Sequence, residues 1–248
     1  MSSVFPVLVA LTVLAACAAA VYGPASRFAR EYLDALLVDA LRGADGTAEE
    51  PALRAAPNRR ALLLPHWQMA LFLVVACAAG CAALGSGRWW ELSLALPMMA
   101  ALTVAGSTDA VCHRLPNGLL GPAALWAAAC VVIEVVARLA AGGGLSQALA
   151  PVGESLAAAA GLGAVTLLLA LVPSGLGMGD VKLCALTGLW LGRFGWAVPV
   201  AGVVAGLFIA GTVAIVLMVL RLARRDTMIA MGPYLIVGAV AAWALAVA

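Results

Sequence analysis

Two aspartates, Asp109 and Asp180, are the residues of this chain best suited to chemistry. Each adjoins a long apolar run and a backbone-breaking segment, Asp109 before Pro116-Asn117-Gly118 and Asp180 in Gly177-Met178-Gly179-Asp180. Two carboxyls that share a site cannot easily both ionise, so one keeps a proton while the other stays charged. Such a pair takes a proton from an attacking water and donates one to a carbonyl oxygen. Because the pair titrates as a unit, neither aspartate is assigned a fixed role.

Three alternating glycines, Gly175, Gly177 and Gly179, precede Asp180. They leave one edge of the segment free of side chains, and glycine permits an unwound backbone. Unwound backbone at membrane depth is tolerated only where it lines a cavity or is buried in protein. We therefore predict that the three glycines bind an extended substrate backbone. The alternative is a plain turn between helices, with glycines for close packing.

The composition indicates a membrane protein. Of the 248 residues, 65% are hydrophobic and only 10% are charged, against about 25% charged in soluble domains. Several apolar runs approach the roughly 20 residues that a helix needs to cross a bilayer. We predict an all-α polytopic protein with about eight transmembrane helices. The predicted spans are 4–22, 68–84, 92–106, 119–139, 156–172, 183–191, 195–220 and 232–247.

The distribution of basic residues predicts which ends of these spans face the cytoplasm. No Lys or Arg precedes the first run, which favours a retained helix with its N-terminus outside rather than a signal peptide. In that orientation 11 basic residues lie inside and only Arg88, Arg138 and Arg193 lie outside, as the positive-inside rule requires. Asp109 and Asp180 then both fall at the cytoplasmic side, where they could be neighbours.

Three segments follow from this layout. Residues 1–23 form the first transmembrane helix, 24–66 a short cytoplasmic loop, and 67–248 the transmembrane domain that carries both aspartates. Within the loop, the apolar spacing over 30–41 predicts an amphipathic helix on the membrane surface, and the remainder is a linker. Arg59-Arg60 is interpreted as a topology determinant rather than a nucleic-acid or lipid-specific site.

Other polar residues are weaker candidates. His113 lies four residues after Asp109 and is interpreted mainly as an interfacial histidine. Lys182 either favours the ionised form of Asp180 or binds a lipid phosphate, and it is included among the substrate-binding candidates. Glu134 lies toward the outer half of its span, and its role stays open.

The cysteine pattern favours neither a metal site nor a disulfide framework. No CxxC pair occurs, and most of the cysteines lie in or beside apolar runs. A Ser/His/Asp constellation and a phosphate-binding loop are also lacking from the sequence, and we expect no cofactor. The six cysteines are Cys17, Cys77, Cys81, Cys112, Cys130 and Cys184.

Three segments resemble the motifs of type IV prepilin peptidases, which are GxGD aspartic proteases of membranes. Residues 177–183 (GMGDVKL) resemble the GxGD motif of that family. Thr108-Asp109 followed by Arg114-Leu115-Pro116-Asn117 resembles the family's other aspartate motif. Residues 231–235 (MGPYL) resemble a Gly-Pro-aromatic segment that opens the last helix. The resemblance covers roughly residue 89 to the C-terminus.

The resemblance implies a membrane aspartic endopeptidase of the bacterial inner membrane, with its active site facing the cytoplasm. Its substrate would be the helix of a type IV prepilin or a secretion-system pseudopilin, cleaved after a glycine just before the hydrophobic segment. Asp109 and Asp180 would be the catalytic pair, and Gly232 and Pro233 join the substrate-binding candidates. The alternative from another class is a small proton- or cation-coupled transporter. A third hypothesis is that the chain is a non-catalytic assembly factor of a pilus system.

This chain departs from many members of that family in one respect. Members that also N-methylate the new N-terminus carry a cytoplasmic domain after the first helix, often with paired CxxC motifs. The corresponding region, 24–66, contains no cysteine. The chain therefore resembles the shorter, peptidase-only members, and we expect the cleaved product to carry a free amine.

Overall fold

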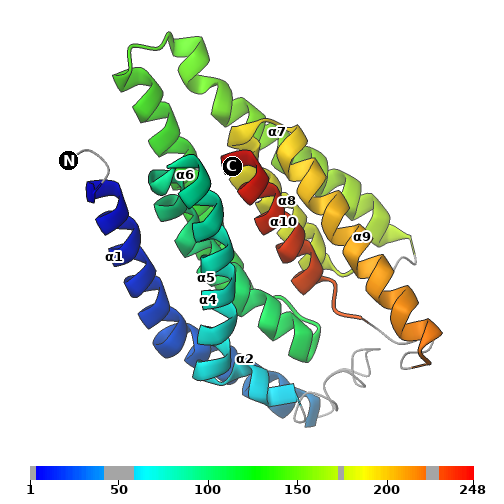
Figure 1. Ribbon diagram of the computed structural model, residues 1–248. Helices are drawn as coiled ribbons and strands as arrows, with labels where there is room; N and C mark the ends of the chain where they lie inside the picture. Colours follow the sequence, from blue (N-terminus) through cyan, green and yellow to red (C-terminus); the bar gives the residue numbers. More distant parts are fainter. Residues whose placement is uncertain (1–3, 42–58, 173–175, 222–228) are drawn as a thin grey trace. The chain divides into compact units, whose positions relative to one another are not determined.

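The computed structural model describes residues 4–41, 59–172, 176–221 and 229–248 (Figure 1). Within these ranges the regular structure is helical and contains no strand, so the predicted all-α class is confirmed there. The α-helices are α1 (Val4–Ala20), α2 (Ser26–Leu41), α4 (Pro65–Ser86), α5 (Trp89–Cys112), α6 (Asn117–Ala140), α7 (Leu145–Leu171), α8 (Met178–Leu191), α9 (Ala197–Val219) and α10 (Gly232–Val247). Three short segments are π- or 3-10-helical, namely η1 (Val21–Ala25), η2 (Arg60–Leu63) and η3 (Gly192–Phe194).

Six helices in the described ranges are long and apolar enough to cross a membrane. They are the helix that begins with α1, together with α4, α5, α6, α7 and α9. Helix α8 has 14 residues and α10 has 16, and both are shorter than the roughly 20 residues that a full crossing needs. The protein is therefore compatible with an all-α polytopic membrane protein, and the predicted total of eight spans stays a prediction.

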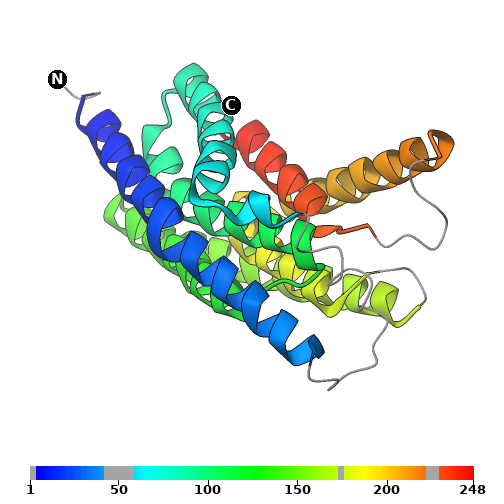
Figure 2. The same ribbon diagram turned by 90° about the horizontal axis from the view of Figure 1, so that it is seen from below.

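The first helix is longer than the sequence analysis predicts. Helices α1 and α2 are joined through η1, and Val4–Val38 counts as one candidate span of 35 residues; Figure 2 shows it as one long rod. At 1.5 Å per residue it is about 50 Å long, more than the roughly 30 Å of a bilayer's apolar core. The amphipathic segment thus begins at Ser26 as a continuation of α1, and does not start afresh at Arg30.

The continuity depends on how the chain accommodates Pro24. Proline has no N–H to donate within the helix, and its ring disturbs the preceding turn. Here the helix widens into the π-helical turn η1. The hydroxyl of buried Ser26 donates to the carbonyls of Tyr22 at 2.8 Å and Gly23 at 3.2 Å. These bonds satisfy two carbonyls at the irregular turn. The helix therefore changes its hydrogen-bonding pattern at η1 and continues into α2.

The chain divides into two compact units, Met1–Leu119 with Met228–Pro233, and Leu120–Thr227 with Tyr234–Ala248. In the first unit α5 packs against α1 and α4. In the most apolar stretch of α5, 83% of the residues are buried, against 17–28% in the corresponding stretches of the other five candidate spans. A buried polar bond joins α4 to α5, since the Gln68 amide donates to the Ser107 hydroxyl at 2.8 Å. Helix α5 is thus the most enclosed span, and it is the one that carries Asp109.

Glycines allow the closest helix contacts of the second unit. A Cβ at Gly188 would lie 2.6 Å from the backbone of Ala158, and one at Gly192 would lie 2.5 Å from the Cα of Ser155. Helix α8 and the following η3 can therefore approach α7 this closely only with glycine at these positions. Helices α9 and α10 approach in the same way, with Gly206 against the backbone of Leu235. Small residues at such contacts are typical of packed membrane helices. Asp180 lies in the first turn of α8, the helix that packs against α7 in this way.

Helix α7 begins earlier than predicted. The segment 141–155 was expected to be a loop, but α7 already begins at Leu145 and includes Pro151. Proline inside a helix leaves the carbonyl of the residue four positions earlier without its N–H partner. For Pro151 that carbonyl belongs to Gln147, and the Arg138 guanidinium donates to it at 3.3 Å. A side chain from α6 thus supplies the hydrogen bond that Pro151 cannot.

Candidate active site

Asp109 lies in the last turn of α5 and is 5% exposed. Its Oδ2 accepts a hydrogen bond from the backbone N–H of Gly232 at 3.0 Å. Gly232 is the first residue of α10, 123 positions later in the chain. Both residues belong to the first compact unit. The structure therefore brings together one predicted catalytic residue and one predicted substrate-binding residue.

The contact between Gly232 and Asp109 leaves no room for a side chain. A Cβ built on Gly232 would lie 2.6 Å from Oδ2 and 3.0 Å from Cγ of Asp109. Real Cβ atoms essentially never approach another heavy atom this closely, so any other residue must displace the carboxylate or the start of α10. The neighbouring Pro233 is half-buried.

The chain leaves α5 directly after Asp109 through His113. The His113 N–H donates to the Asp109 carbonyl at 2.8 Å, and His113 adopts the left-handed conformation with φ 54°. A left-handed residue after the last turn is a common way to end a helix. His113 therefore ends α5 and is half-buried. Its position at the membrane interface stays a prediction.

Asp180 occupies the first turn of α8 and is 7% exposed. Its Oδ2 accepts a hydrogen bond from the backbone N–H of Gly177 at 3.0 Å, while its own N–H donates to the Gly177 carbonyl at 3.0 Å. The first bond is one half of a capping box, in which the side chain of an acid at the third helical position accepts the N–H of the N-cap residue. The negative charge is also favoured by the helix N-terminus. Asp180 thus has a structural role in starting α8.

The environment of Asp180 has opposing effects on its ionisation. Asp180 lies at the N-terminal end of α8, outside the six candidate spans. Burial raises the pKa of its carboxyl above the ordinary value, and the Gly177 N–H, which stabilises the ionised form, opposes that rise. The protonated form is therefore easier to populate than in an exposed aspartate, as an acid–base role requires.

The predicted substrate-binding glycines near Asp180 differ in backbone conformation where the structure describes them. Gly175 lies outside the described residues. Gly177 is exposed and extended, with φ −87° and ψ 161°. Gly179 already lies inside α8, so the three glycines do not form one unwound edge. The predicted unwound backbone is therefore wrong at Gly179, because α8 begins at Met178. Substrate binding by these glycines stays a prediction.

Lys182 is exposed, two residues beyond Asp180 on α8. Residues two positions apart on a helix do not face each other, so this spacing does not direct the ammonium toward the Asp180 carboxylate. The lipid-phosphate interpretation of Lys182 stays a prediction. The pairing of Asp109 with Asp180 also stays a prediction, because the two aspartates belong to different compact units.

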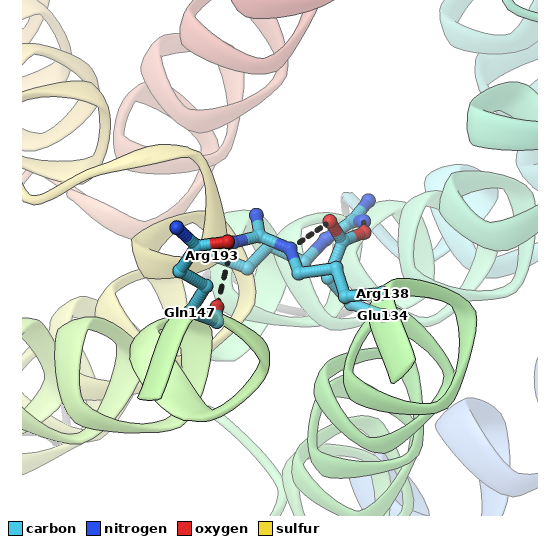
Figure 3. A network of polar contacts seen from close by, with 4 residues as sticks. All are labelled: Glu134, Arg138, Gln147 and Arg193. Carbon is cyan, nitrogen blue, oxygen red and sulfur yellow. Dashed lines mark hydrogen bonds and ion pairs between the residues drawn. The ribbon is translucent and has the colours of Figure 1, made fainter. Parts of the chain in front are cut away.

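Glu134, whose role the sequence left open, belongs to an ion-pair network (Figure 3). Its carboxylate accepts from Arg138 Nε at 3.0 Å and from Arg193 Nη1 at 3.4 Å. The Arg193 side chain is only 1% exposed, and its guanidinium also lies 4.2 Å from the centre of the Phe194 ring. A buried guanidinium needs a counter-charge, so Glu134 compensates Arg193 and links α6 to η3.

Two hydrogen-bonded contacts of the site were not predicted from the sequence. The Gly177–Asp180 cap was detectable, since an acid three residues after a glycine at a helix start fits the capping pattern. The Gly232–Asp109 contact had no local signal, because it joins positions 123 residues apart. Among the described residues no group of three or more His, Cys, Asp or Glu could hold a metal ion.

Comparison of the chain with protein-family models, curated proteins and solved structures found no match.

Proposed function

We propose that this chain is a membrane aspartic endopeptidase that cleaves the leader of type IV prepilins or pseudopilins at the cytoplasmic membrane face. Asp109 and Asp180 are its catalytic pair. The observation that carries the proposal is the shared setting of the two aspartates. Each is buried, lies at the end of a helix, and accepts a glycine N–H at 3.0 Å. Buried ionisable groups in a membrane protein are costly, and their default interpretation is functional.

In the proposed reaction one carboxylate removes a proton from water as the water oxygen attacks the carbonyl carbon of the scissile peptide bond. The other carboxyl, initially protonated, donates its proton to the carbonyl oxygen. A tetrahedral gem-diol results, and the proton has moved from one aspartate to the other. The reverse transfers then re-form the carbonyl as a carboxylic acid and protonate the departing nitrogen, which breaks the C–N bond. No covalent intermediate with the protein is formed.

The resemblance to prepilin peptidases supplies the substrate class, and the order of its three motifs supports it. Two of these motifs meet in the first unit, where residues 108–117 supply Asp109 and residues 231–235 supply Gly232. The transporter alternative needs polar groups that continue across the membrane. Glu134, which was the remaining candidate for such a path, is engaged by Arg138 and Arg193, so we favour the peptidase.

The proposal is tested by incubating a prepilin with membranes that contain the wild type, Asp109→Ala or Asp180→Ala. We expect the leader to be removed only by the wild type. Cleavage by either variant at the wild-type rate would remove that aspartate from the mechanism. If the wild type cleaves nothing but carries a proton or cation flux in liposomes, and Asp180→Ala abolishes that flux, the transporter is the correct function. Tolerance of both substitutions by a pilus-assembling cell would favour an assembly factor.

A further inference from the structure

Gly232 was predicted from the sequence to contact substrate, and its surroundings indicate another role. It is buried, and its N–H is directed to Oδ2 of Asp109 at 3.0 Å. Its missing side chain leaves the space that the Asp109 carboxylate occupies, since a Cβ there would meet Oδ2, Cγ and Cβ of that residue. The free volume at Gly232 is therefore filled by the protein's own carboxylate.

We infer that Gly232 is a positioning residue for Asp109, which holds the carboxylate by its N–H and by leaving room for it. This inference rests on the proposed function for its effect on catalysis, but the contact itself is a property of the fold. A backbone donor is well suited to the task, because a backbone N–H has no rotamers and is fixed by the start of α10.

Steady-state kinetics of Gly232→Ala distinguish a positioning role from substrate binding, because the first lowers kcat and the second raises KM. In Gly232→Ala the new methyl group displaces the carboxylate, and a misplacement of about 1 Å in a catalytic group can cost roughly 100-fold in rate. We therefore expect kcat for prepilin cleavage to fall by about 100-fold with KM nearly unchanged. A rise in KM with kcat preserved would overturn the inference and return Gly232 to the substrate-binding residues.

The matched control is Gly121→Ala. Gly121 is also helical but, unlike Gly232, exposed, and a Cβ on it would meet nothing within 4 Å. Alanine is the better helix former, so we expect this variant to keep the wild-type kcat and at least the wild-type Tm. A loss of activity in Gly121→Ala as large as that in Gly232→Ala would show that the assay reports general helix perturbation, and would overturn the assignment.

A thermal-unfolding cycle tests the contact without any activity assay. Gly232→Ala should lower the Tm of the purified protein by several degrees in the wild-type background. In the Asp109→Ala background the same substitution should lower the Tm much less. The two closest atoms, at 2.6 and 3.0 Å, are then absent, and only the Cβ at 3.2 Å remains. Equal shifts in the two backgrounds would overturn the inferred contact.

The two readouts separate failure of the inference from failure of the proposed function. If the wild type shows no cleavage but the Tm cycle shows coupling, Gly232 positions Asp109 and the peptidase proposal is wrong. If the wild type cleaves prepilin and the Tm cycle shows no coupling, the peptidase stands and the positioning role is wrong.

Discussion

The backbone N–H of Gly232 donates to Oδ2 of Asp109 at 3.0 Å, across 123 residues of sequence. The bond fixes the carboxylate at the end of α5 against the first residue of α10. Asp180 has an equivalent partner in Gly177, also at 3.0 Å, but at the N-cap of its own helix. Both aspartates are thus held by glycine N–H groups, one through tertiary structure and one through a local cap.

The replacement of Asp180 by Asn should separate folding from catalysis. The amide oxygen of Asn still accepts the Gly177 N–H, so the cap of α8 is largely kept, whereas an amide cannot exchange the proton that the reaction requires. We expect Asp180→Asn to unfold close to the wild-type temperature and to be inactive in the prepilin assay. Asp180→Ala should also lose the bond to the Gly177 N–H, so it should be less stable than Asp180→Asn. Substantial cleavage by a folded Asp180→Asn variant would contradict the role assigned to this carboxyl.

The free energy of unfolding should depend on pH because the Asp180 carboxyl is buried. Because burial raises its pKa above the unfolded value, its contribution to stability is fully present below the ordinary pKa of about 3.9 and is lost as the pH rises through the folded pKa. Asn carries no such titration. The free energy of unfolding of the wild type, relative to Asp180→Asn, should therefore decrease as the pH rises above about 4. A constant or increasing difference in chemical unfolding in micelles would contradict this sign.

The ion-pair network should matter for stability rather than for chemistry. In Glu134→Gln the Arg193 guanidinium, 1% exposed, loses its carboxylate, and an uncompensated buried charge costs about 3 kcal/mol or more. Arg138 is 39% exposed, so Arg138→Gln should cost only about 1 kcal/mol or less. The measurement is unfolding in detergent for both variants. Equal costs for both variants would show that Glu134 does not compensate Arg193.

The product of cleavage should carry a free amine. The segment 24–66 contains no cysteine, and the chain resembles the peptidase-only members of the family. We expect intact-mass measurement of a pilin processed by the purified protein to give the mass of the unmodified mature chain, with or without a methyl donor. A gain of one methyl group at the new N-terminus, dependent on the donor, would contradict the prediction.

Most elements of the fold were predictable, because long apolar runs in a membrane protein form helices. Each predicted span coincides with a helix, although the boundaries shift where proline is accommodated. Pro24 is absorbed by a π-helical turn supported by Ser26, and Pro151 by Arg138, which donates to the carbonyl of Gln147. Side-chain hydrogen bonds accompany both prolines, and hydropathy does not predict such bonds.

The candidate site was predictable in its residue types and less so in its contacts. Asp109 and Asp180 were identifiable because charge is rare beside apolar runs. The position of Gly179 inside α8 was not predicted, since the alternating glycines favoured an extended segment and the capping bond of Asp180 decided otherwise. The partner of Asp109 was beyond prediction, because nothing local to residue 109 indicates Gly232.

The central claim is that Asp109 and Asp180 form one acid–base pair, and its most direct test is the distance between them in the membrane. In a cysteine-free variant, Asp109→Cys with Asp180→Cys is treated with a bifunctional thiol reagent that spans only a few ångströms. Asp109→Cys with Lys182→Cys serves as the control, since Lys182 lies two positions further around α8. We predict efficient cross-linking of the 109–180 pair and little of the 109–182 pair. Reaction of both thiols at 109 and 180 without a cross-link would contradict the account.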